Sequence, residues 1–112
     1  MGKKNKKLVT KNEFRFNRKI SHNTYVFCDD GRNYKAVGIT HSHKTFGKKN
    51  MPLEDNPQKG KKEKAYVRNG IISDNHSHFD KPKKNFNFSK ADFPKVKSKI
   101  RNYKKKTSGR RK

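Results

Sequence analysis

Four of the five histidines stand in two copies of one tripeptide, His-Ser-His, at positions 41–43 and 76–78. The stretches HSHKTFGKKN (41–50) and HSHFDKPKKN (76–85) share this opening and a KKN close. Histidine titrates near neutral pH, so a pair of histidines can ligate a metal or act as acid and base. The two copies therefore raise three interpretations: a metal site, a catalytic pair, or a by-product of a chain rich in Lys and Asn.

A metal site requires the four imidazoles to converge. Residues i and i+2 of a strand share a face, so each tripeptide could present two histidines, and a four-histidine zinc site is chemically possible. The surrounding lysines repel a dication, however, and Asp74 and Asp80 are the only carboxylates close by in sequence. We therefore expect no metal and no cofactor.

Catalysis without a metal is the second interpretation. Cleavage of RNA by its own 2′-hydroxyl needs a base, an acid and cations around the phosphate. The segment THSHKT (40–45) gathers two histidines, a lysine and hydroxyls, and an arginine stands on another predicted strand. The candidate catalytic residues are His41, His43, Lys44 and Arg68. Two exposed polar histidines in a loop explain the same pattern, and both readings stay open.

The composition limits which elements can position these residues. The chain has 112 residues, of which only 27% are hydrophobic, and a formal net charge of +23. Low hydrophobicity with high charge is typical of disorder, but eight Phe and four Tyr favour a small folded middle with basic ends. A single cysteine excludes a disulfide framework. With no apolar run of ~20 residues and no secretory signal, we expect a cytoplasmic protein.

The pattern predicts a small α+β domain. Alternation in 13–19 indicates a strand, 23–40 a β-hairpin around DDGRN, and 64–73 another strand, with long loops at 45–63 and 74–87. Ser89 or Asp92 can cap a final helix that runs to about residue 105. Its apolar face consists of Phe93, Val96, Ile100 and Tyr103. We expect one domain over 13–105, a small antiparallel sheet with one C-terminal helix, between a flexible basic arm (1–12) and a disordered basic tail (106–112).

The C-terminal helix and its tail carry one sign of charge. From Phe93 to the end there is no acid, and the i,i+4 neighbours Lys95/Lys99 and Lys97/Arg101 repel one another. A helix that carries only positive charges, although their repulsion lowers its stability, is suited to binding a polyanion. The candidate nucleic-acid-binding residues are Lys48, Lys49, Lys95, Lys97, Lys99, Arg101, Lys104, Lys105, Arg110 and Arg111.

Nucleic acid is the expected partner, and RNA is favoured over DNA. Lysine outnumbers arginine, which favours contacts to phosphates over bidentate reading of bases. Three phenylalanines interleaved with lysines, Phe46, Phe79 and Phe86, are candidates for stacking on unpaired bases, with ordinary packing as the alternative. The apolar stripe of the helix is short and is used most simply to cover the sheet, so no membrane partner is expected.

Two family resemblances follow from particular segments. GITHS (38–42), KKNMPL (48–53), the Asn56-Pro57 turn and AYVR (65–68) resemble small basic proteins of phages and conjugative elements of low-GC bacteria. The basic residues around THS (40–42) resemble compact ribonucleases of the barnase, colicin and RelE-like group. This second resemblance implies His41 as base or acid, with Lys44 and Arg68 at the phosphate.

Three functions therefore remain after the sequence is read. The first is a small, largely non-sequence-specific nucleic-acid-binding protein. The second is a metal-independent, toxin-like endoribonuclease that uses His41 and His43. The third is a scaffold-type accessory protein that binds an acidic partner protein.

Overall fold

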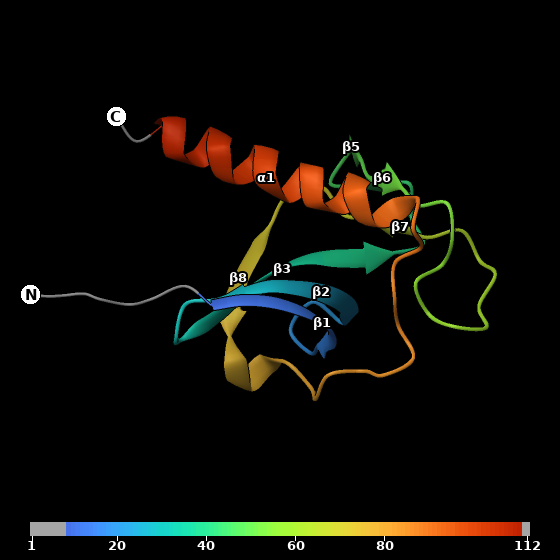
Figure 1. The fold of residues 1–112 in the computed structure, drawn as a ribbon, viewed down its shortest axis with the longest axis horizontal. Helices are drawn as coiled ribbons and strands as arrows, with labels where there is room; N and C mark the ends of the chain where they lie inside the picture. Colours follow the sequence, from blue (N-terminus) through green and yellow to red (C-terminus); the bar gives the residue numbers. More distant parts are fainter. Residues whose placement is uncertain (1–8, 111–112) are drawn as a thin grey trace, which may run out of the picture.

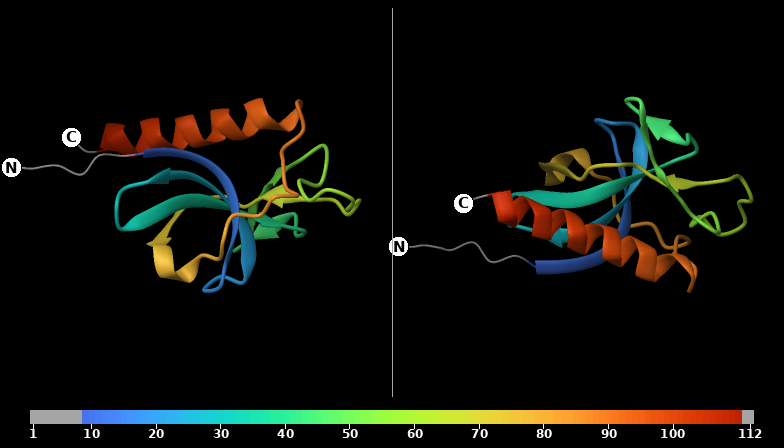
Figure 2. Two further views of the ribbon diagram at one scale, coloured as in Figure 1. Left: turned by 60° about the horizontal axis from the view of Figure 1, so that its bottom comes forward. Right: turned by 90° about the horizontal axis from the view of Figure 1, so that it is seen from above.

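The computed structural model describes the backbone of residues 9–110 and the side chains of residues 9–102. Its elements are β1 (Val9–Asn17), β2 (His22–Asp29), β3 (Asn33–Thr40), β4 (Lys44–Thr45), β5 (Lys48–Lys49), β6 (Met51–Pro52), β7 (Tyr66–Val67), β8 (Ile72–Asn75), the 3-10 helix η1 (His76–His78) and α1 (Asp92–Arg110). The predicted α+β class is confirmed, because α1 lies across one face of a small antiparallel sheet (Figures 1 and 2).

The sheet is an antiparallel meander with a divided edge. Its order is β1-β2-β3-β7-β6, and β8 also pairs with β3. The predicted hairpin over 23–40 corresponds to β2 and β3, in which Tyr25 pairs with Val37. The first half of β3 pairs with β8, and its last two residues, Ile39 and Thr40, pair with β7.

The single strand predicted over 64–73 is wrong in detail. The chain forms β7, turns at Asn69 and Gly70, and continues as β8 along the same neighbour, β3. The interruption arises because Asn69 leaves the ladder and bonds to the segment 45–50 instead. That tertiary contact is absent from the local pattern.

Two apolar clusters hold the layers together. Between sheet and helix, Phe14, Tyr25, Val37 and Val67 are buried with Val96 and Ile100 of α1. On the opposite face, Val26, Tyr34, Ala36 and Phe79 form a smaller cluster. Val96 and Ile100 thus take the places predicted from helical spacing, whereas Phe93 stays 36% exposed and the side chain of Tyr103 lies outside the described part.

Of the two predicted caps, Ser89 caps the start of α1, whereas Asp92 bonds to a distant loop. The Ser89 hydroxyl oxygen accepts the Asp92 N–H at 3.1 Å, as an N-cap side chain does. The fully buried Asp92 carboxylate accepts the N–H groups of Glu54 and Asp55 at 2.7 and 3.1 Å, so it ties the loop after β6 to the helix. These hydrogen bonds outweigh burial, which acts to raise the pKa of Asp92, and the pKa falls below its usual range.

The boundaries differ from the predicted ones at both ends. β1 begins at Val9 and pairs with the end of β2, so 9–12 of the expected arm belong to the sheet. α1 continues through 106–110 of the expected tail. Residues 1–8 and 111–112 lie outside the described residues. Within the described part, no helix is long and apolar enough to cross a membrane.

Candidate nucleic-acid interface

A short hairpin projects where the sequence predicted a loop. Lys44 pairs with Lys49, and Thr45 pairs with Lys48, around a two-residue turn formed by Phe46 and Gly47. Both turn residues have positive φ, 52° and 77°, as a type I′ turn requires. Phenylalanine is a poor choice there, which is why the local pattern gave no hairpin signal. The Phe46 ring is 91% exposed.

Two asparagines fasten this hairpin to the sheet. The buried Asn50 donates from its amide to the Ser42 carbonyl at 3.0 Å and to the Thr45 hydroxyl at 2.8 Å. Asn69, which follows β7 and Arg68, donates from its amide to the carbonyls of Thr45 and Lys48 at 3.2 and 3.1 Å. The Asn50 side-chain oxygen accepts the Asn69 N–H at 2.9 Å. The tip is therefore held in place by contacts from outside the hairpin.

The side chain of Arg68, the residue before Asn69, extends to the tip of the hairpin. Its backbone N–H bonds to the Gly38 carbonyl at 2.8 Å, and its guanidinium lies over the Phe46 ring, 5.9 Å from the centroid. A Cβ at Gly38 would stand 2.6 Å from Cδ of Arg68, so only glycine leaves room for this side-chain path. The structure therefore brings Arg68 to the same projection as Lys44, Lys48 and Lys49.

The sequence segments that form and support this hairpin contain no carboxylates. No Asp or Glu occurs in 31–53, 64–73 or 93–112. Among the described residues, no ion pair involves Lys44, Lys48, Lys49 or Arg68. Of the six ion pairs among the described residues, four involve β1, η1 or the residues next to them: Arg15–Glu13 at 2.9 Å, Arg18–Asp80, and one for each histidine of η1. The positive charges of the hairpin are thus not neutralised by carboxylates of the described residues.

The predicted basic face of α1 is described in its first half. Lys97 and Arg101 are exposed, and the Lys97 ammonium lies 5.5 Å from the centroid of the Phe93 ring. Lys95 is partly neutralised by Asp92 at 3.4 Å and Glu54 at 4.0 Å. Lys99 is half-buried, and that burial lowers its pKa. The side chains of Lys104, Lys105 and Arg110, and the whole of Arg111, lie outside the described part.

The first His-Ser-His unit lies at the foot of the hairpin. β3 ends at Thr40, so His41 and His43 are not on a strand and do not share a face in the way that the metal interpretation assumed. His41 is exposed, and its Nδ1 lies 3.1 Å from the Lys64 carbonyl oxygen. Among the described residues, no hydrogen bond or ion pair joins the side chains of His41, His43, Lys44 and Arg68, and no cluster of His, Cys, Asp or Glu could hold a metal ion.

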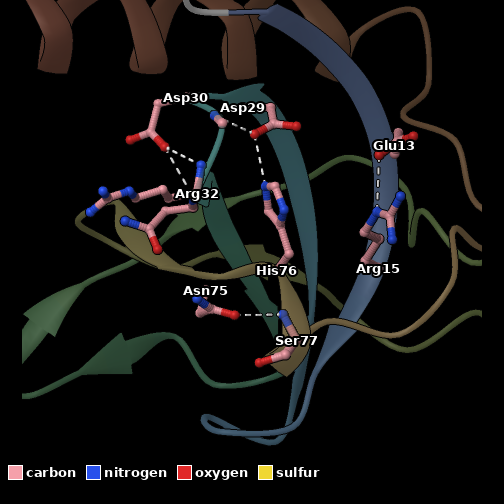
Figure 3. Close-up of polar contacts among 10 residues, drawn as sticks. Glu13, Arg15, Asp29, Asp30, Arg32, Asn75, His76 and Ser77 are labelled. Atoms are coloured by element: carbon pink, nitrogen blue, oxygen red, sulfur yellow. Dashed lines mark hydrogen bonds and ion pairs between the residues drawn. The ribbon is translucent and has the colours of Figure 1, made fainter. Parts of the chain in front are cut away.

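The second unit has a different role. Figure 3 shows His76 of η1 reaching Asp29 at the end of β2, with Nε2 2.8 Å from Oδ1. His78 contacts Asp74 at 2.8 Å, and Asp74 also accepts the Asn17 amide at 2.9 Å. Burial acts to raise the pKa of Asp29, but hydrogen bonds from the Gly31 N–H and from His76, with the charges of His76 and Lys11, lower it. These contacts fasten η1 to the sheet.

Two of the three stacking candidates are corrected by the structure. Phe79 and Phe86 are 6% and 8% exposed and belong to the two apolar clusters, so their rings are not available to bases. Phe46 alone of the three is open to solvent. The sequence pattern of Phe among Lys is the same in all three places, and only the chain path separates them.

No protein-family model, curated protein or solved structure matches the chain.

Proposed function

We propose that this protein is a small basic nucleic-acid-binding protein that contacts mainly the phosphate backbone, without sequence specificity, and that favours RNA over DNA. The observation that supports it best is the hairpin tip, which carries three lysines, has Arg68 over an exposed ring, and has no carboxylate partner among the described residues. Lysine ammonium groups act as point charges toward phosphates. RNA offers unpaired bases to such a ring more often than DNA does. The free, buried Cys28 suits a reducing cytoplasm.

Salt titration tests this proposal. The affinity for a single-stranded RNA should fall linearly on a log–log plot, with a slope of about −0.7 for each phosphate neutralised. We expect contact with at least three phosphates, and hence a slope of about −2 or steeper. A flat response contradicts the proposal. Duplex DNA of the same sequence should bind more weakly, and equal affinity would remove the preference for RNA. Polyglutamate that binds as tightly as RNA would favour the acidic-partner alternative.

The clearance between Gly38 and Arg68 supplies a second prediction. In Gly38→Ala, the Arg68 side chain must shift away from the new Cβ, and we expect this shift to move its guanidinium off the Phe46 ring. A cation–π contact of about 0.5–1 kcal/mol would then be lost, which weakens RNA binding by roughly two- to five-fold without removing a charge. The control is a double-mutant cycle: Gly38→Ala should have no further effect on binding in an Arg68→Ala background. Additive losses would show that Gly38 acts in another way.

An endoribonuclease centred on His41 is the alternative that the His41 ring orientation favours. A carbonyl oxygen can only accept, so Nδ1 must donate to Lys64, and Nε2 of the neutral ring is then unprotonated and able to act as a base. Incubation of labelled RNA with the protein in EDTA separates the two functions. Cleavage that disappears in His41→Ala supports the enzyme, whereas intact RNA overturns it.

A further inference from the structure

A groove lies between α1 and the strand segments that carry the hairpin. It has a volume of about 750 Å³, which is in the range of sites for small ligands. Met51, Ile71 and Pro94 contribute apolar surface. Lys95, Lys99 and Asn102 contribute charge and hydrogen-bonding groups from α1. This combination of apolar and cationic walls suits a ligand with a flat apolar part and an anionic part, as a nucleotide has.

The groove begins next to the residues that hold the base of the hairpin. Asn50 and Asn69 clamp the hairpin, and the residues that follow them, Met51 and Gly70, line the groove. β6 lies next to the N-terminal half of α1, where the Lys95 ammonium donates to the Pro52 carbonyl oxygen at 3.3 Å.

The backbone at Phe46 indicates that its ring serves a purpose other than folding. A residue with a Cβ in the left-handed region costs about 1–2 kcal/mol relative to a favoured conformation, and Asn or Gly is preferred at this turn position. Phe46 has φ 52° and recovers little of this cost by burial, because it is 91% exposed. An exposed aromatic ring held at a strained position beside Arg68 is well suited to stacking on a base.

The charges of the groove select an anion. Lys95 shares its charge with Asp92, but Lys99 has no ion pair among the described residues, and burial disfavours its charged form. A phosphate in the groove would restore that charged form. A second copy of this chain would bring another +23 against the same surface, so self-association does not fill the groove.

We propose that the target is an unpaired nucleic-acid strand, with one base stacked on Phe46 and another nucleotide of the same strand held in the groove between α1 and the segment Gly70–Ile71. The proposal rests on the proposed function and narrows it. In a duplex the bases are stacked and paired inside the helix, so neither the ring nor the groove can take one. A duplex would therefore bind only through contacts between its phosphates and the hairpin lysines.

Phe46→Asn separates stacking from folding. Asn-Gly is the preferred type I′ pair, so this variant should melt at the same temperature or higher. Its affinity for a single-stranded octanucleotide should fall by roughly 5- to 100-fold, the equivalent of one base stack, while its affinity for a duplex stays unchanged. Equal affinities of the wild type and Phe46→Asn for the single strand would overturn the stacking role.

Phe46→Trp supplies the matched control. The chain has no tryptophan, so this variant carries one reporter at the tip. It should keep the affinity of the wild type, and its fluorescence should be quenched by the single strand and not by the duplex. Quenching by both, or by neither, contradicts base stacking.

Methyl NMR tests the groove itself. Met51 is one of two methionines in the chain, the other being Met1, so a protein labelled at methionine methyls gives two assignable signals. The Met51 signal should move when the octanucleotide is added and stay in place with the duplex. If single strands and duplexes bind alike with steep salt dependence and Met51 does not move, this inference fails and the proposed function stands. If neither binds, both fail.

Discussion

Replacing Asp92 with Ala is expected to lower the free energy of unfolding by about 3 kcal/mol, because two buried N–H groups lose a charged acceptor. The Asp92 carboxylate is fully buried and accepts from Glu54 and Asp55, which joins the loop after β6 to the first turn of α1. Urea denaturation followed by circular dichroism measures the loss. The control is Glu54→Gln, which removes the exposed partner of Lys95 and should cost less than about 0.5 kcal/mol.

The same carboxylate makes stability depend on pH. The folded pKa of Asp92 lies below its unfolded value, so its contribution is fully present above about pH 4 and is lost as pH falls through the folded pKa. Asp29 and Asp74 are shifted in the same direction and add to this acid sensitivity. The free energy of unfolding of Asp92→Asn should fall less steeply than that of the wild type as the pH is lowered. An unchanged acid transition would show that the Asp92 charge contributes nothing to stability.

Replacing the three hairpin lysines has the largest expected effect on binding. If Lys44, Lys48 and Lys49 each neutralise one phosphate, their replacement by Gln should reduce the salt slope by about 2 and the affinity for single-stranded RNA on the order of a hundred-fold at ~0.1 M salt. The hairpin should persist, because its clamp uses the side chains of Asn50 and Asn69 and not those of the lysines. Fluorescence anisotropy at several salt concentrations measures both quantities.

A matched variant separates the effect of the hairpin lysines on binding from the effect of net charge. Lys19, Lys81 and Lys84 are exposed and lie outside the hairpin, in the turn between β1 and β2 and in the segment between η1 and α1. Replacing these three with Gln removes the same charge and should weaken binding only a few-fold through the general field of the protein. Equal losses in the two triple variants would contradict a localised interface.

Local sequence pattern was sufficient for the regular elements. The hairpin around DDGRN, the apolar spacing of Val96 and Ile100, and the cap at Ser89 depend on neighbours within a few residues, so strand alternation and helical spacing predict them. The absence of acids from 31–53, 64–73 and 93–112 is likewise a property of the sequence.

The arrangement of the candidate site depends on contacts between distant residues. The Phe46-Gly47 turn runs against turn preference and is held by Asn69, which stands beyond two further strands. The two His-Ser-His units are identical, yet η1 meets Asp29 and Asp74 while 41–43 meets no carboxylate among the described residues. Likewise, Phe79 and Phe86 are buried where Phe46 is exposed. Sequence determined the charge, the elements and the chemical groups, whereas tertiary packing decided which of those groups face solvent together, because that choice depends on partners far apart in the chain.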